Sequence, residues 1–194
     1  MILWINGPFG VGKTQTAFEL HRRLPGSTVF DPESFGYFLR RNTPKKMHYP
    51  DFQDDPLWRE TNAKILHSLA KAHDGVVIVP MTVICFTYFE ELLAPVLQEG
   101  LPVKKYTLLA QRPVILRRIK SRGPRKDSWA IGKLDACLSA LSDEAFGKSV
   151  FTDGLTISQA AEEIARHEGL SLLPRAGKLK QAVNIIRTSL QHIR

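Results

Sequence analysis

A glycine-rich segment near the N-terminus constrains the fold of this 194-residue chain more than any other feature. Gly7 and Gly12 are separated by four residues, and Lys13 and Thr14 follow directly. An apolar run that predicts a buried strand precedes the loop, and a helical pattern that ends at Pro25 follows it. The segment therefore matches the phosphate-binding P-loop at every defined position and in its strand–loop–helix context.

The residue types in this loop have a direct chemical reason. Glycines let successive backbone N–H groups turn inward around phosphate oxygens, and the start of the following helix adds its positive dipole end. Lys13 is expected to reach the β- and γ-phosphates and to act in catalysis, and Thr14 to place its hydroxyl on Mg²⁺. We expect ATP with Mg²⁺ to contact one continuous stretch of the chain: Gly7, Phe9, Gly10, Val11, Gly12, Lys13, Thr14 and Gln15.

Strands and helices alternate along the rest of the chain. Further strands are expected at residues 28–30, 76–79, 103–109 and 150–151, and helices at 33–41, 56–75, 87–100, 113–122, 128–141 and 156–169. Thr87 with Glu90 and Thr156 with Gln159 form two capping-box patterns, and residues 43–55 have the composition of a long loop. Such alternation predicts an α/β fold with a parallel sheet and helices on both faces.

The charge distribution narrows the choice of partners. The chain has a formal net charge of +8, from 27 Lys and Arg against 19 Asp and Glu. Nine basic residues fall in 104–126 and five in 175–194, two blocks without any acid, so the remaining chain is net acidic. No aromatic residues interleave with the charges of the basic helix, as stacking on nucleic-acid bases would require. We therefore expect no nucleic acid as partner.

A P-loop alone does not identify the reaction. In motor ATPases and GTPases a carboxylate is expected at the end of a neighbouring strand, but the strand at 76–79 continues into Pro80, Met81 and Thr82. The chain also has no base-reading motif of GTPases. The length of the chain and the lack of this carboxylate favour the compact small-molecule kinases.

Asp31 is the candidate residue for the acceptor substrate. It ends the second predicted strand, so it should face the crevice at the carboxyl ends of the strands. A carboxylate there can orient an acceptor hydroxyl and take its proton. Asp31 precedes Pro32 and is equally suited to cap a helix. Gln53, Asp54 and Asp55 form a second acidic candidate, which loop and cap roles also explain.

Arg118 and Arg122 are the candidate residues of a lid at about 112–127. They are four apart on one helix face, beside an apolar stripe, and Gly123-Pro124 resembles a hinge. Arginines that close over transferring phosphates stabilise the charge that develops there. A solvated basic helix face is the alternative.

The last segment, residues 175–194, is expected to form a basic amphipathic helix outside a domain of residues 1–174. Its stripe includes Leu179, Val183, Ile186 and Leu190, with lysines and arginines beside it. It can dock on its own core or another subunit, or lie on an anionic membrane surface. Two cysteines without a C-x-x-C pattern, and the lack of a spanning apolar segment, indicate a cytoplasmic protein, with peripheral attachment at the inner face of the membrane as an option.

An ordered set of motifs resembles the tunicamycin-resistance family of ATP-binding proteins over nearly the full length. The set comprises Trp4-Ile5-Asn6-Gly7, Gly12-Lys13-Thr14-Gln15-Thr16-Ala17, Asp31-Pro32-Glu33, Asp51-Phe52-Gln53, Pro56-Leu57-Trp58-Arg59, Val79-Pro80-Met81-Thr82, Ser128-Trp129-Ala130 and Thr152-Asp153. The resemblance implies a three-layer P-loop NTPase fold of the nucleoside or nucleotide kinase kind, with a five-stranded parallel sheet and a mobile lid. It also implies that Asp31, Gln53 and Trp58 line a pocket for a nucleoside antibiotic that carries uracil and several sugars. A basic tail that holds the protein at the membrane is a further implication of it.

Two functions follow from these observations. In the first, the protein is an ATP-dependent phosphotransferase that phosphorylates a hydroxyl of tunicamycin or a related nucleoside. Lys13 and Thr14 then hold the phosphates and Mg²⁺, Arg118 and Arg122 close over them, and Asp31 addresses the acceptor. In the second, nucleotide binding gates sequestration or export of the drug without covalent modification, which the missing carboxylate after residues 76–79 leaves open.

Overall fold

The computed structural model describes residues 1–121 and 127–192 and contains one parallel sheet of five strands. The strands are β1 (Ile2–Asn6), β2 (Thr28–Val29), β3 (Val77–Pro80), β4 (Val103–Leu109) and β5 (Lys148–Phe151). They lie in the order β2-β3-β1-β4-β5, and every neighbouring pair is parallel. β1 and its loop therefore occupy the centre of the sheet, where the strand order reverses and ligands bind in such folds.

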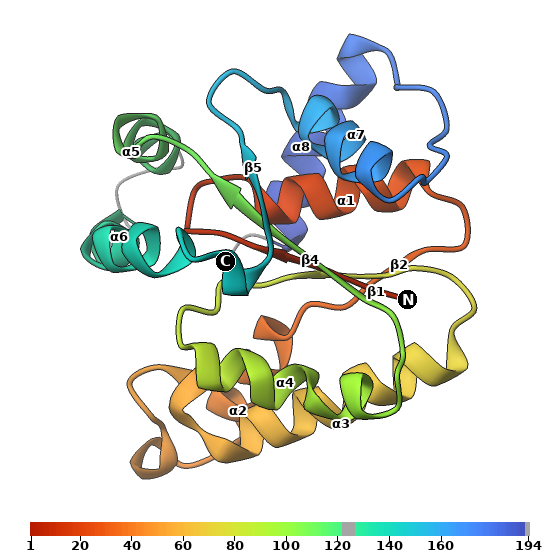
Figure 1. Ribbon diagram of the computed structural model, residues 1–194. Helices are drawn as coiled ribbons and strands as arrows, with labels where there is room; N and C mark the ends of the chain where they lie inside the picture. The colour runs from red at the N-terminus through yellow and green to blue at the C-terminus, as the bar shows by residue number, and fades with distance from the viewer. Residues whose placement is uncertain (122–126, 193–194) are drawn as a thin grey trace.

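Helices cover both faces of the sheet (Figure 1). α1 (Lys13–Arg23), α7 (Ile157–His167) and α8 (Lys178–His192) lie on one side, and α2 (Glu33–Asn42), α3 (Pro56–Ala72) and α4 (Phe86–Gln98) on the other. α5 (Arg112–Lys120) and α6 (Asp127–Leu141) pack against each other beyond the end of β4. The predicted three-layer P-loop NTPase architecture and its five-stranded parallel sheet are confirmed.

The central strand explains why the sheet needs two helical layers. All five residues of β1 are buried, and their side chains alternate between the two hydrophobic clusters of the core. Leu3 and Ile5 belong to the cluster with α1 and α7, whereas Ile2 and Trp4 belong to the cluster with α3 and α4. A strand that is apolar on both sides is stable only when both faces are covered.

Local sequence signals account for most of the helix boundaries. The Thr156–Gln159 capping box is present at the start of α7, as predicted. The Thr87–Glu90 capping box is wrong, because the N-cap of α4 is Cys85, two residues before Thr87, and its side chain makes no cap hydrogen bond. The predicted loop at 43–55 contains two short 3₁₀ helices, η1 (Lys45–Met47) and η2 (Phe52–Asp54). A third, η3 (Glu144–Phe146), precedes β5.

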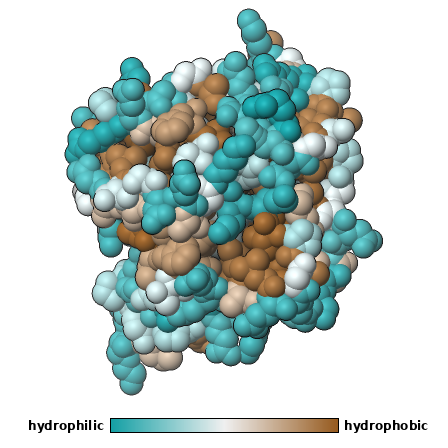
Figure 2. All heavy atoms as spheres, viewed as in Figure 1, coloured by the Kyte–Doolittle hydropathy of each residue, from teal (hydrophilic) through white to brown (hydrophobic). Residues whose placement is uncertain are grey.

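The outer surface is mainly hydrophilic, and hydrophobic residues are visible between the sheet and the α3–α4 layer (Figure 2). Within residues 1–121 and 127–192, no helix has the length and apolar character needed to cross a membrane.

Candidate active site

The P-loop joins β1 to α1 and has the conformation that its glycines permit. Gly7, Gly10 and Gly12 have φ angles of 146°, 83° and 113°, a region that residues with side chains rarely adopt. A Cβ on Gly7 would lie 2.6 Å from the Leu108 carbonyl oxygen, and one on Gly10 would lie 2.6 Å from a side-chain carbon of Ile119. The loop therefore requires glycine both for its turn and for its close packing on β4 and α5.

Asn6 and Thr82 fix the first turn of the loop. The buried Asn6 side chain donates to the Val83 carbonyl (2.9 Å), and its oxygen accepts from the N–H groups of Gly7 (2.8 Å) and Val83 (3.1 Å). Thr82 Oγ1 donates to the Gly7 carbonyl (2.9 Å). The segment after β3, which has no carboxylate, thus holds the P-loop in place. Sequence reasoning assigned Asn6 and Thr82 no role, although both belong to the family motifs.

Lys13 and Thr14 lie where the P-loop pattern predicts them. Lys13 is 8% exposed and extends back along the loop, where its Nζ donates to the Pro8 carbonyl (3.1 Å) and lies 5.5 Å from the centre of the Phe9 ring. Thr14 lines a cavity beside the P-loop. In the described part of the chain no group of three His, Cys, Asp or Glu residues could hold a metal. The P-loop pattern assigns the Thr14 hydroxyl to a cation, and this assignment stays a prediction.

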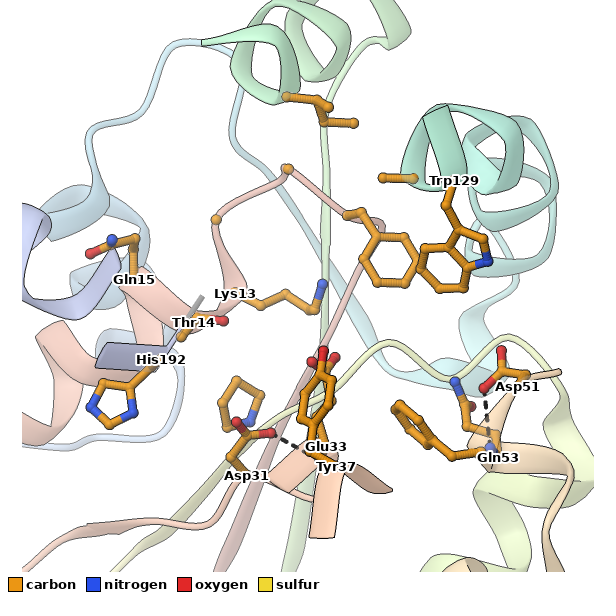
Figure 3. Close-up of a pocket in the computed structure, with 17 residues that line it drawn as sticks. Lys13, Thr14, Gln15, Asp31, Glu33, Tyr37, Asp51, Gln53, Trp129 and His192 are labelled. Carbon is orange, nitrogen blue, oxygen red and sulfur yellow. Dashed lines mark hydrogen bonds between the residues drawn. The ribbon is translucent and has the colours of Figure 1, made fainter. Parts of the chain in front are cut away.

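A cavity of about 210 Å³ opens beside the P-loop, and most of the predicted site residues line it. Its walls come from the P-loop, the segment after β2, the start of α2, η2 and the start of α6, with single residues from β3, α5 and the end of α8. Asp31, Glu33 and Gln53 line it, and Trp129 packs edge-on against Phe9 with ring centres 4.9 Å apart. Figure 3 shows Glu33 and Tyr37 pointing from α2 toward the Lys13 amine. We call this space the acceptor cavity.

Asp31 caps a helix and also faces the cavity, and its action on an acceptor stays a prediction. Its Oδ1 accepts the backbone N–H of Glu33 (3.0 Å) and so caps the start of α2. Its side chain also lines the acceptor cavity. The cap directs the first turn of α2 toward the P-loop, which places Glu33 beside Lys13.

Glu33 is a residue of the acceptor cavity that sequence reasoning missed. Burial, together with the negative charges of Asp31 and Asp51, raises the pKa of its carboxyl to about 7, although the Lys13 amine opposes the shift. A group with this pKa exchanges protons readily near neutral pH, as a general base must. Its motif Asp31-Pro32-Glu33 was visible in the sequence, but only the fold shows that α2 turns this side chain into the cavity.

Of the two residues Gln53 and Trp58, only Gln53 lines the acceptor cavity. Gln53 lines the acceptor cavity, as predicted. Trp58 does not: its indole is fully buried, donates to the Pro32 carbonyl (3.1 Å) and packs on Phe52. The helical stripe of α3 directs Trp58 into the core, so it supports the site from behind. Asp55 caps α3 through the Leu57 N–H (2.9 Å), in agreement with its cap role.

Arg118 does not line the acceptor cavity but belongs to a second cavity that also borders the P-loop. Its guanidinium donates to the Val11 carbonyl (3.1 Å) and to the Thr152 hydroxyl (3.0 Å) and carbonyl (2.7 Å), and burial lowers its pKa. In this structure it therefore links the P-loop to the turn after β5. Its contact with transferring phosphates stays a prediction. Arg122 lies outside the described residues.

α8 docks on α1 through its polar side. Thr188 is buried and accepts from the Arg22 guanidinium (3.2 Å). The apolar stripe points outward: Leu179 is 87% exposed and Ile186 is 59% exposed. Docking on the core, one of the three predicted options, is thus seen, but with the face opposite to the apolar stripe.

Comparisons with known proteins agree with this geometry. Residues 2–139 match the family model described as "AAA domain". The tunicamycin resistance protein of Deinococcus radiodurans is 36% identical, with a TM-score of 0.74 over 90% of this chain and 99% of that chain. A sugar kinase from Janibacter is 19% identical (TM-score 0.63, 87% of this chain and 94% of that one) and shows the same fold. So does a gluconokinase from Sinorhizobium meliloti at 14% identity (TM-score 0.61, 85% and 91%).

No protein with a curated description matches the sequence. The family model spans more than half of the chain, and the Deinococcus protein is similar over almost the whole of both chains. The chain belongs to the AAA-domain family of P-loop kinase-like proteins that includes the tunicamycin resistance protein of Deinococcus radiodurans.

Proposed function

We propose that the protein is an Mg·ATP-dependent phosphotransferase whose acceptor is a hydroxyl of a nucleoside antibiotic of the tunicamycin type. The observation that carries the proposal is the meeting of two kinds of group in one cavity. Lys13 of the P-loop and the carboxyl groups of Asp31 and Glu33 line the same space. The similarity to a tunicamycin resistance protein supplies the acceptor class.

The residues present suit a bound triphosphate. The P-loop turns at three glycines with positive φ, and α1 begins at Lys13 with no acidic residue in its first turn. Phosphates on this loop would therefore meet backbone N–H groups, a helix N-terminus and the Lys13 amine. Mg²⁺ would neutralise charge on the phosphates, with the Thr14 hydroxyl as its protein ligand.

Asp31 and Glu33 supply the chemistry on the acceptor side. In the reaction the acceptor oxygen forms a bond to the γ-phosphorus, and the bond from that phosphorus to the β,γ-bridging oxygen breaks. The acceptor proton passes to a carboxylate. Glu33 is the proposed base, because its pKa of about 7 leaves it able to take a proton at neutral pH and to release it afterwards. Asp31 orients the hydroxyl, and Gln53 and Trp129 line the acceptor cavity around it.

The test is ADP formation that depends on the drug. The unmodified protein with Mg·ATP is expected to release ADP faster when tunicamycin is added, and Glu33→Gln should abolish this increase while ATP still binds. Tyr37→Phe is a matched control on the same face of α2, because it removes a cavity hydroxyl without removing a carboxylate. If tunicamycin leaves ADP release unchanged, the phosphotransferase proposal fails.

A second function stays in consideration because β3 ends in Pro80 and continues into Met81 and Thr82, without a carboxylate. In that function, ATP binding gates capture or export of the drug, and the drug is released unmodified. Tunicamycin would then bind more tightly in the presence of ATP, with no product. The outward apolar stripe of α8, flanked by Lys178, Lys180 and Arg187, would suit either function at an anionic membrane surface.

A further inference from the structure

A second cavity, of about 770 Å³, also borders the P-loop and shares Gly10, Gly12 and Gln15 with the acceptor cavity. Its walls are the P-loop, Arg118, the segment from Thr152 to Ile157 after β5, and the α8 residues Ile185 and Ser189. A triphosphate whose terminal phosphate faces Glu33 would direct its nucleoside into this space. α8 would then be part of the nucleotide site, a role that the P-loop pattern does not predict for a C-terminal helix.

The link between α8 and the P-loop runs through Gln15. Its Nε2 donates to the Ile185 carbonyl (3.0 Å) and to Ser189 Oγ (2.9 Å). Gln15 is the second residue after the P-loop lysine, so it lies beside the place where a bound phosphate would be. Near the end of the helix His192 stacks on Phe18, with ring centres 4.1 Å apart. α8 is therefore held against the nucleotide-binding end of α1.

Two buried polar atoms at this place lack a partner within the described residues. Gln15 Oε1 and Thr16 Oγ1 make no hydrogen bond, although Gln15 is only 6% exposed and Thr16 only 1% exposed. Both residues line the second cavity. Buried polar atoms are nearly always paired in folded proteins, so these two are available to a ligand in the second cavity. A nucleoside offers ribose hydroxyls and amino groups as donors to the Gln15 oxygen, and ribose hydroxyls and ring nitrogens to the Thr16 hydroxyl.

The chemical character of the walls suits the same ligand. Leu155, Ile157 and Ile185 supply apolar surface for the faces of a base, and Thr156 and Ser189 supply hydroxyls for its polar edges. We propose that α8 forms one wall of the nucleoside pocket, so that nucleoside binding and docking of α8 stabilise each other. The inference rests on the proposed function, because it requires a nucleoside triphosphate on the P-loop. Coupling of this kind is reciprocal.

The first test compares ATP with inorganic triphosphate, both with Mg²⁺, by titration calorimetry. Inorganic triphosphate reaches the P-loop but not the nucleoside pocket. Ser189→Phe should fill that pocket and weaken ATP binding about tenfold or more, with the affinity for inorganic triphosphate changed less than about twofold. Val183→Phe is the matched control: Val183 is on the same helix, is 58% exposed and does not line the cavity, so both affinities should stay unchanged.

The second test uses the unmodified protein and does not depend on a variant that folds. ATP should slow amide hydrogen exchange at residues 185–190 severalfold more than inorganic triphosphate does. Equal exchange with the two ligands, or ATP binding that Ser189→Phe leaves unchanged, would overturn the inference. Failure of the unmodified protein to bind either ligand would instead overturn the proposed function, and with it the basis of the inference.

Discussion

The stability of the protein should depend on pH through Glu33. In the unfolded chain the pKa of a glutamate is about 4.5, and in the folded protein burial and the nearby Asp31 and Asp51 raise it to about 7. Between these two values the folded state binds more protons than the unfolded state. The free energy of unfolding therefore falls as pH rises from about 4.5 to about 7, and stays reduced above it. Glu33→Gln removes the charge and should remove this loss.

The size of the effect follows from the shift. Each pKa unit corresponds to about 1.4 kcal/mol, so a rise from 4.5 to about 7 gives an upper value of about 3 kcal/mol. The Glu33 side chain is only partly buried, and solvent screening reduces the expected value to about 2 kcal/mol. Relative to the unmodified protein, Glu33→Gln should therefore gain about 2 kcal/mol between pH 5 and pH 8.

Urea unfolding at a series of pH values measures this difference directly. Comparing the two proteins cancels the shared titrating groups that do not interact with Glu33. Glu60→Gln is the control: Glu60 is exposed, and its hydrogen bond to Lys64 lowers its pKa, so its contribution changes only below about pH 4.5. Its difference from the unmodified protein should be constant between pH 5 and pH 8. A constant difference for Glu33→Gln as well would refute the assigned electrostatics of the site.

Three further predictions test the rest of the site. Asn6→Ala should lower the free energy of unfolding by about 2–4 kcal/mol in urea titration, because it leaves the buried N–H groups of Gly7 and Val83 unpaired. The control is Asn42→Ala at an exposed position, which should change the free energy of unfolding by less than about 0.5 kcal/mol. Lys13→Ala should weaken ATP binding by at least about tenfold in calorimetry, with an unchanged circular dichroism spectrum. Asp31→Asn should keep the cap on α2, and with it the free energy of unfolding, but lower turnover at least about tenfold at similar ATP affinity. A loss of stability without loss of turnover would mean that Asp31 only caps the helix.

Local patterns in the sequence predicted most of the fold. The P-loop with its flanking strand and helix, the buried strand at 76–79 and the capping box of α7 each depend on residues close together in the chain, and each is found. The Thr87–Glu90 pattern failed because Cys85 has the extended conformation that starts α4, so the helix takes in Thr87 itself. A pattern that short does not fix the start of a helix to within one or two residues.

The site was harder to predict because its properties depend on contacts between distant segments. The raised pKa of Glu33 comes from burial and from Asp51, which η2 brings to the cavity. Trp58 was expected in the pocket from the family motif, but its place on the apolar stripe of α3 directs it into the core. Each of these outcomes requires knowing which helix packs on which.

α8 shows the same limit in another form. Its hydrophobic stripe identifies an amphipathic helix, and such a stripe usually faces the core. Here the hydroxyls of Thr188 and Ser189 face α1, where Arg22 and Gln15 bind them, and the stripe is exposed. Arg22 and Gln15, which turn the polar side of α8 toward α1, lie more than 160 residues earlier in the chain.

The central claim is that the protein transfers a phosphoryl group to a nucleoside antibiotic. Mass spectrometry of tunicamycin after incubation with the protein and Mg·ATP tests it most directly. We predict a product heavier by one phosphate, which is absent without ATP and absent with Lys13→Ala. Tunicamycin that keeps its mass, in the presence of protein that binds both ATP and the drug, would contradict phosphoryl transfer and leave nucleotide-gated binding as the function.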